Sequence, residues 1–168
     1  MSQFDTNWSF ISEGDLIPEG FCYAGISAGL KNSKKKDLAL ILAPEGSICS
    51  GMFTQSIVRA SCIDICEERI KRSSGLIRAI LINSGQANAC TGDYGTQHCL
   101  IATSKISELL GIKEEEVLMC STGVIGVPIQ INELVKNLPK LVSELKANSF
   151  SNAAEAILTT DLTIKKIG

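Results

Sequence analysis

The sequence lacks the features that mark nucleic-acid-binding and membrane proteins. Lys and Arg number 16 against 18 Asp and Glu, so the net charge of -2 leaves no basic excess to neutralise phosphate groups. No stretch approaches the roughly 18 apolar residues of a membrane-spanning helix, and Met1–Ile11 has neither the basic start nor the apolar block of an export signal. We therefore expect a cytoplasmic protein without a nucleic-acid or membrane partner.

Histidine and paired cysteines are also scarce. His98 is the only histidine, which excludes a metal site built on several histidines. The 7 cysteines are scattered without a Cys-x-x-Cys pair, so buried reduced thiols are expected in place of a disulfide framework or a zinc site. His98 stands beside Cys99 and Leu100 on a helical stretch and is interpreted as a structural or surface residue. No metal and no cofactor are predicted.

Three glycine fingerprints are missing as well. The sequence contains no Gly-x-Gly-x-x-Gly of a dinucleotide site, no Gly-x-x-x-x-Gly-Lys-Ser/Thr of a P-loop and no Gly-x-Ser-x-Gly of a serine hydrolase. Its glycine-bearing turns are therefore interpreted as places where another molecule approaches the backbone, without a nucleophile of their own.

What the sequence does contain is an ordinary globular composition with mixed helices and strands. With 45% hydrophobic and 20% charged residues, the 168 residues can bury a real core, and we assign 1–168 to a single α/β domain. Apolar runs and their periodicity predict the elements. Strands are expected at Asp37–Leu42, Ser47–Thr54, Leu76–Ile82 and Val117–Cys120, and helices at Ile57–Arg72, Thr96–Leu110, Ile131–Leu145 and Ala153–Leu158.

Local features refine this prediction. The first two strands are expected to form an antiparallel hairpin through the turn at Pro44–Gly46. Gly111 is expected to end a helix, and Pro139 to kink or break one. Asn152 and Glu155 have the spacing of a capping box.

Two of the expected strands run into polar loops that contain glycine. Asn83–Gly92 follows one of these strands, and Ser121–Gly126 follows the other. Ligand sites on α/β sheets commonly form at such strand ends. The Thr122 hydroxyl and the Gly123 N–H are donors of the kind that an oxyanion hole requires, although the same residues suit an ordinary turn. Two asparagines of the first loop are interpreted either as pinning the backbone or as contacting a substrate: Asn83 and Asn88.

Six groups of residues occur along the chain in an order that is specific to one family. They are Gly20-Phe21 with Ala24-Gly25 and Ala28–Lys31, Asp37–Ile41, Gly51–Thr54, Asn83–Gly92, Ser121–Gly126 and Thr159–Asp161. From about Pro18 to Asp161 the chain closely resembles the α chain of the ornithine acetyltransferase family, the bifunctional glutamate N-acetyltransferases of arginine biosynthesis. Gln86 departs from the family, which commonly has Asn there, but keeps the amide.

The resemblance implies an activity and a set of site residues. In the family, a precursor cuts itself in front of a threonine that becomes the N-terminal nucleophile of a β chain, while the α chain supplies the oxyanion hole. The residues of that hole match Thr122 and Gly123 here, and the family's substrate-binding threonine falls on Thr159, with Thr160 as the alternative. The nucleophilic threonine and a substrate-binding lysine are expected outside this sequence. The implied reaction moves an acetyl group from N-acetylornithine to glutamate, with acetyl-CoA as a possible alternative donor.

The resemblance also implies an architecture and partners. We expect the layered helix–sheet α/β fold of the self-processing ornithine acetyltransferases, with this chain as one half of an αβ unit and a heterotetramer of two α and two β chains. The stretch Leu162–Ile167 has partly alternating apolar residues and is expected to form a strand that a partner completes. Two other interpretations stay open: a related self-processing aminopeptidase-like hydrolase, and a non-catalytic small-molecule-binding α/β domain.

Overall fold

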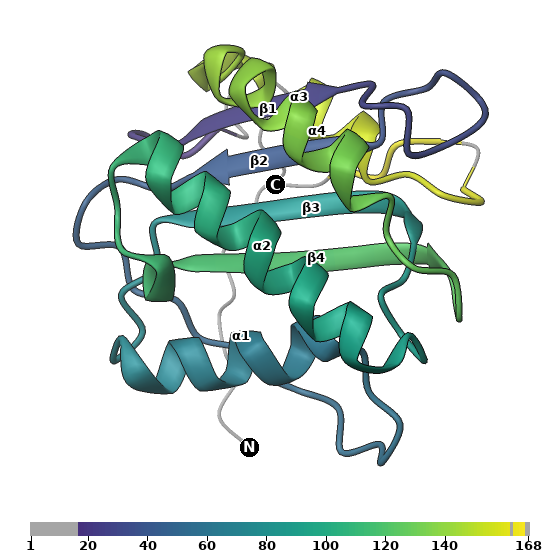
Figure 1. Cartoon of the computed structure of the whole chain (residues 1–168). Coiled ribbons are helices and arrows are strands. Elements are labelled where there is room, and N and C mark those ends of the chain that lie inside the picture. The colour runs from purple at the N-terminus through teal and green to yellow at the C-terminus, as the bar shows by residue number, and fades with distance from the viewer. Residues whose placement is uncertain (1–16, 162, 167–168) are drawn as a thin grey trace, which may run out of the picture.

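A four-stranded mixed sheet forms the centre of the molecule in the computed structural model, which describes residues 17–161 and 163–166 (Figure 1). The strands neighbour one another in chain order, β1 with β2 and β2 with β3 antiparallel, and β3 with β4 parallel. The strands are β1 (Cys22–Ile26), β2 (Leu38–Leu42), β3 (Ala79–Gln86) and β4 (Val117–Val124), and the α-helices are α1 (Ser61–Arg72), α2 (Gly92–Leu110), α3 (Ile131–Ser143) and α4 (Phe150–Ala156). Two short 3₁₀ helices, η2 (Glu114–Glu116) and η3 (Ala147–Ser149), complete the elements.

One face of the sheet carries the main core. Alternate residues of a strand point to the same face, so Leu38 and Leu40, Leu81, and Met119 line up across three strands, and all are buried. Helices α2 and α3 cover this face (Figure 1) and contribute apolar residues at helical spacing. Those residues are Cys99, Ala102 and Ile106 from α2, and Leu134, Leu138 and Leu141 from α3.

The opposite face is covered unevenly. Helix α4 packs there on β1 and β2, where Tyr23 and Ala39 meet Ala153 and Ala156. A Cβ on Gly25 would collide with the backbone at Asn152, so this glycine allows α4 to lie directly on β1. Helix α1 lies along the free edge of β4 (Figure 1). The part of this face on β3 and on the later half of β4 is therefore less covered by the described helices.

The predicted hairpin is wrong. Strand β2 pairs with β1 and β3, whereas Ser47–Thr54 is not a strand and makes only a single bridge, between Ile48 and Leu76. The partner of β2 is β1, which lies within the glycine-rich stretch Pro18–Lys31, whose sequence suggests a loop or an irregular strand. Alternation alone does not specify which strand pairs with which.

Most helices lie where the sequence places them, with shifted ends. Helix α2 starts at Gly92 and ends at Leu110, and Gly111, with a left-handed φ of 65°, stops it as predicted. Helix α3 continues through Pro139 and is not broken there. The predicted capping box at Asn152 is wrong, because its side chain and that of Glu155 both bind Lys36 Nζ, at 2.8 and 2.7 Å.

Two further observations concern the whole described chain. Residues 163–166 do not form the strand expected at the C-terminal end, and Leu162 and Ile167 lie outside the described residues, as do residues 1–16. Within 17–161 and 163–166, the helices are too short or too polar to cross a membrane.

Candidate active site

The parallel pairing of β3 with β4 brings the two polar stretches together. Asn83 lies opposite Ser121, Ser84 opposite Thr122 and Gly85 opposite Gly123. The two polar stretches, each predicted at the end of a strand, thus lie side by side at the carboxyl ends of β3 and β4, on the right-hand side of Figure 1. The strands are longer than predicted, however, and Thr122 lies inside β4 rather than in a turn after it. The ladder continues because both strands carry a glycine at the same level.

These two glycines allow an unusually close approach. Gly85 has a φ of 129° and Gly123 a φ of 130°, a region that side-chain-bearing residues rarely adopt. A Cβ on Gly123 would stand 2.5 Å from the carbonyl oxygen of Gly85 and 2.8 Å from the nitrogen of Gln86. The local backbone beside Thr122 therefore requires glycine on both strands.

The Gly123 N–H is directed to the free edge of the sheet. The carbonyls of Val117 and Met119 accept bonds from α1, on that edge, whereas the carbonyl of Val124 accepts a bond from Ala87, which follows β3. Because backbone groups alternate between the two edges of a strand, those of Gly123 share the direction of Val117 and Met119. No strand in the described ranges pairs with β4 on this edge.

The side chains around Thr122 leave its hydroxyl available. Ser121 Oγ is held 2.6 Å from Asn83 Oδ1, on the face opposite to that of Thr122. Thr122 is half-buried, and across the described part of the chain its hydroxyl makes no hydrogen bond. A donor pair made of this hydroxyl and the Gly123 N–H can stabilise a negatively charged oxygen that is brought to it.

The two asparagines of the first loop pin the backbone. Asn83 is fully buried, and its Nδ2 donates to the carbonyl of Gln86 at 3.0 Å. Asn88 has a φ of 52° and donates from Nδ2 to the carbonyl of Gly95 at 3.1 Å, near the start of α2. Of the two interpretations left open by the sequence, both side chains fit the structural one.

The stretch that carries Thr159 lies at the same end of the sheet. Ser84, the register partner of Thr122, donates from Oγ to the carbonyl of Ala156, the last residue of α4. Lys31 Nζ donates to the carbonyl of Leu158, directly before Thr159. Thr159 and Thr160 are both exposed. Sequence reasoning missed Ser84 and Lys31 as residues that bring this stretch to β3.

A groove of about 460 Å³ opens beside Gly85. Its lining includes Gly85 and Gln86 from β3, Val124 from β4, and Leu30 and Lys31 from the loop after β1. The groove has room for a small ligand beside Gly85, and Thr122, Gly123 and Thr159 are not among its lining residues.

The cysteines are free thiols, but only Cys62, Cys66 and Cys99 are buried, so the expectation of buried thiols holds for three of the seven. Four cysteines are poorly suited to form thiolates. Burial raises the pKa of Cys99 to about 12, and burial also raises the pKa values of Cys62 and Cys66. Cys120 is exposed as a residue, yet the groups packed around its thiol desolvate it and raise the pKa of Cys120 to about 12. Cys90 is exposed as well.

Histidine and metal chemistry find no support in this part of the chain. The His98 ring lies near that of Tyr94 within α2, with 6.1 Å between ring centroids and the planes tilted by 46°. The described residues contain no group of three or more His, Cys, Asp or Glu side chains suited to a metal.

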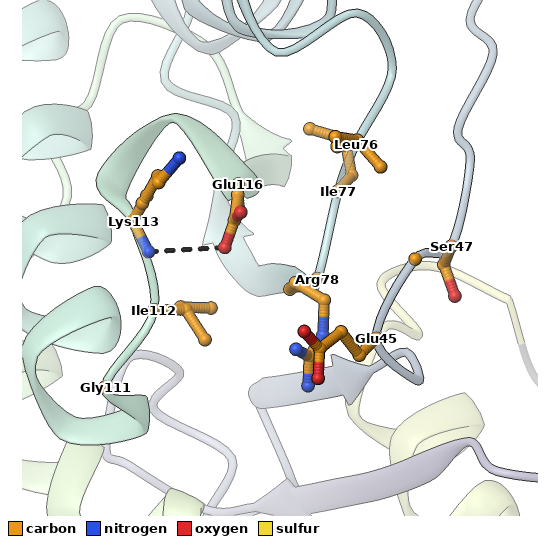
Figure 2. A pocket seen from close by; sticks show the side chains of 10 residues that line it. Glu45, Ser47, Leu76, Ile77, Arg78, Gly111, Ile112, Lys113 and Glu116 are labelled. Carbon is orange, nitrogen blue, oxygen red and sulfur yellow. Dashed lines mark hydrogen bonds between the residues drawn. The ribbon is translucent and has the colours of Figure 1, made fainter.

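A second and larger pocket, of about 710 Å³, lies at the opposite end of β3 and β4 (Figure 2). It is lined by charges of both signs, Glu45 and Glu116 against Arg78 and Lys113. Arg78 Nε donates to the carbonyl of Ala43 at 3.0 Å, and the Lys113 N–H donates to Glu116 at 3.3 Å, the bond drawn in Figure 2. This pocket would be the candidate site of a non-catalytic binding domain, and it does not include Thr122.

Comparison with known proteins gives consistent matches. Residues 22–168 match the ArgJ family. The arginine biosynthesis bifunctional protein ArgJ of Prochlorococcus marinus subsp. pastoris is 77% identical over 94% of this chain, and that of a Synechocystis strain is 42% identical over 96%. The chain spans 39% of the length of each of these relatives.

Solved structures agree with the fold. The crystal structure of ornithine acetyltransferase complexed with ornithine, from Mycobacterium tuberculosis, superposes with a TM-score of 0.84 at 32% identity, over 88% of this chain and 80% of that one. The arginine biosynthesis bifunctional protein ArgJ of Bacillus halodurans gives a TM-score of 0.81 at 32% identity, over 86% of this chain and 75% of that one. The expected α/β architecture is therefore confirmed. On the match over residues 22–168 and the identity to these relatives, the chain belongs to the ArgJ family.

Proposed function

We propose that this chain is the α subunit of an acyltransferase that moves the acetyl group of N-acetylornithine to glutamate. The observation that carries the proposal is the donor pair at the free edge of β4, the unbonded Thr122 hydroxyl and the outward-directed Gly123 N–H. The names of the relatives, and the ornithine with which the mycobacterial enzyme is complexed, support the same reaction.

The reaction needs a nucleophile that a β chain would supply. An N-terminal threonine of that chain attacks the acetyl carbonyl through Oγ, and its own α-amino group takes the hydroxyl proton. The carbonyl oxygen becomes a tetrahedral oxyanion, which accepts hydrogen bonds from Thr122 and Gly123. Collapse breaks the bond to the ornithine nitrogen, which leaves with the proton. The amine of glutamate then attacks the acetyl ester and gives a proton to the α-amino group of the threonine, through a second oxyanion at the same donors. The bond to the threonine Oγ breaks, Oγ takes that proton back, and N-acetylglutamate is released.

The β chain packs, in this proposal, on the face of β3 and β4 that the described helices cover least. The pair next to Thr122 on this face is Ile82, which is half-buried, and Cys120, which is exposed; Ile80, opposite Leu118, is half-buried as well. A partner that covers Ile82 and Cys120 can also bring its N-terminal threonine to Thr122 and Gly123, because these four residues lie at the same end of the sheet. The relatives, which are more than twice as long as this chain, have the length needed for such a partner. We further propose that self-cleavage of a precursor produces the two chains and that two αβ units form a cytoplasmic heterotetramer.

Substrate recognition is assigned in part to Thr159. Its position, after the carbonyls held by Ser84 and Lys31, places it at the end of the sheet that carries Thr122. A hydroxyl here can bind the polar groups of an amino-acid substrate while Thr122 acts on its acetyl carbonyl. Acetyl-CoA is a candidate second donor of the acetyl group.

The test is a product analysis with the full-length protein. Supplied with N-acetylornithine and glutamate, it should form N-acetylglutamate and ornithine in equal amounts. Acetate with no N-acetylglutamate would show a hydrolase, and binding without turnover would show a non-catalytic domain. Either result would reject the proposal.

A further inference from the structure

A buried carboxylate folds the loop between β1 and β2. Asp37 is fully buried, and its Oδ1 accepts the N–H of Ala28 at 2.6 Å. Its Oδ2 accepts the N–H groups of Leu30 and Lys31, at 2.6 and 3.0 Å. Three backbone donors satisfy a carboxylate that has left water, and they fix the course of Ala28–Lys31.

This loop rests on the glycine pair. The Leu30 carbonyl accepts a bond from Gln86 Nε2 at 2.8 Å, and it would stand 3.0 Å from a Cβ placed on Gly85. The backbone carbonyl of Asp37 accepts the N–H of Ser84 at 2.8 Å. The segment Ser84–Gln86 is thus held from one side by the loop and by Asp37 itself, and on its other side it meets Thr122 and Gly123.

The same loop reaches the stretch that carries Thr159. Lys31 Nζ donates to the carbonyls of Lys36, at 3.3 Å, and of Leu158. Burial lowers the pKa of Lys31, while the nearby Asp37 opposes that shift. A half-buried ammonium whose protons go to two carbonyls acts as a fixed clamp between the loop and the residue before Thr159.

From these contacts we propose that Asp37 and Lys31 are positioning residues that act through the loop Ala28–Lys31. Asp37 aligns the glycine pair and, with it, the oxyanion donors, whereas Lys31 aligns Thr159. The inference rests on the proposed acetyl transfer, because it assigns residues to the two parts of that site. It separates them kinetically: Asp37 serves the transition state, and Lys31 serves substrate binding.

The test compares variants of the full-length protein, with rates counted per cleaved molecule by mass spectrometry. Asp37→Asn puts an NH₂ group against backbone N–H donors, so kcat should fall by about 10-fold or more. Lys31→Met keeps the length and removes the clamp, so KM for N-acetylornithine should rise by about 10-fold while kcat stays within about twofold. Lys31→Arg, which can still donate to both carbonyls, should restore KM toward the wild-type value.

Arg69→Met is the control for lost stability. Arg69 is also buried, but it binds the carbonyl of Val117 at 2.7 Å and Glu114 at 2.6 Å, at the opposite end of β4. The Arg69→Met substitution should lower the melting temperature without changing kcat or KM. If the Asp37 and Lys31 variants match this control, or if Lys31→Met lowers kcat at unchanged KM, the inference is overturned. A wild-type protein that does not transfer acetyl groups would instead reject the proposed function.

Discussion

Gly85 and Gly123 face each other across the parallel strands β3 and β4, where Gly123 has no room for a side chain and a Cβ on Gly85 would stand only 3.0 Å from the Leu30 carbonyl oxygen. This pair lets β4 continue past Thr122 as a regular neighbour of β3 while its backbone takes φ values near 130°. The hydroxyl of Thr122 and the N–H of Gly123 are thereby held on an extended strand. Donors fixed before the substrate arrives need no reorganisation during the reaction.

Gly123→Ala should be strongly destabilising. The added Cβ meets the backbone of Gly85 and Gln86, which cannot move without opening the ladder, and the φ of 130° adds strain. We expect the free energy of unfolding to fall by about 3 kcal/mol or more, measured by urea denaturation of the full-length protein.

Gly46→Ala is the matched control for that measurement. Gly46 has a φ of 80° with no atom within 4 Å of the added Cβ, so only the backbone strain of about 1–2 kcal/mol is expected. Equal losses of stability in the two alanine variants would show that the close approach of Gly85 and Gly123 is unimportant.

The sequence predicts the parts of this site better than their connections. The polar stretches after two apolar runs, and the helix stop at Gly111, follow from local chemistry that the structure retains. The expected hairpin fails because alternation in Ser47–Thr54 does not tell whether a strand finds a partner. The glycines at 85 and 123 suggest turns in the sequence, yet their role is to allow two strands to approach.

The positioning contacts were beyond a sequence-based prediction for a related reason. Asp37 stands next to an apolar run, where an acidic residue suggests a solvent-exposed strand start. Its burial depends on three N–H groups of a loop whose course the sequence does not show. Likewise, the bonds of Ser84 and Lys31 to the carbonyls around Thr159 span more than 70 residues. Such contacts appear only once the chain is folded.

Thiol labelling should map the face that the partner covers. Cys120 is exposed in this chain but has its pKa raised to about 12, so a maleimide should modify it slowly at pH 8 and faster as the pH rises. Over hours, Cys120 should be labelled after the chains are separated and protected in the assembled protein, because the partner then covers the face beside Thr122. Cys99, which is buried, should react only on unfolding.

Labelling also tests whether any cysteine is catalytic, which we do not expect because no cysteine takes part in the proposed reaction. Equal labelling of Cys120 in the separated and assembled proteins would place the β chain elsewhere. If labelling of Cys90 or Cys120 abolished activity, and if bound substrate prevented that loss, the labelled thiol would be catalytic.

Thr159→Val should weaken substrate binding. Valine keeps the shape and removes the hydroxyl, so a lost hydrogen bond of about 0.5–1.5 kcal/mol should raise KM for N-acetylornithine by roughly 2- to 12-fold with little change in kcat. Thr160→Val, the neighbouring exposed threonine, is the control and should leave both constants unchanged. The reverse pattern would assign the substrate contact to Thr160.

The most direct test of the account is the turnover number of Thr122→Ala, measured with N-acetylornithine and glutamate on chains that are co-expressed separately, so that self-cleavage does not enter. Loss of one oxyanion donor should lower kcat by about 10²–10³, or roughly 3–4 kcal/mol, with the melting temperature and substrate binding nearly unchanged. The Ser121 hydroxyl donates to Asn83 on the opposite face, so the Ser121→Ala variant should lose stability but keep the wild-type turnover number. A Thr122→Ala enzyme that turns over within a factor of about three of the wild type would contradict the oxyanion assignment.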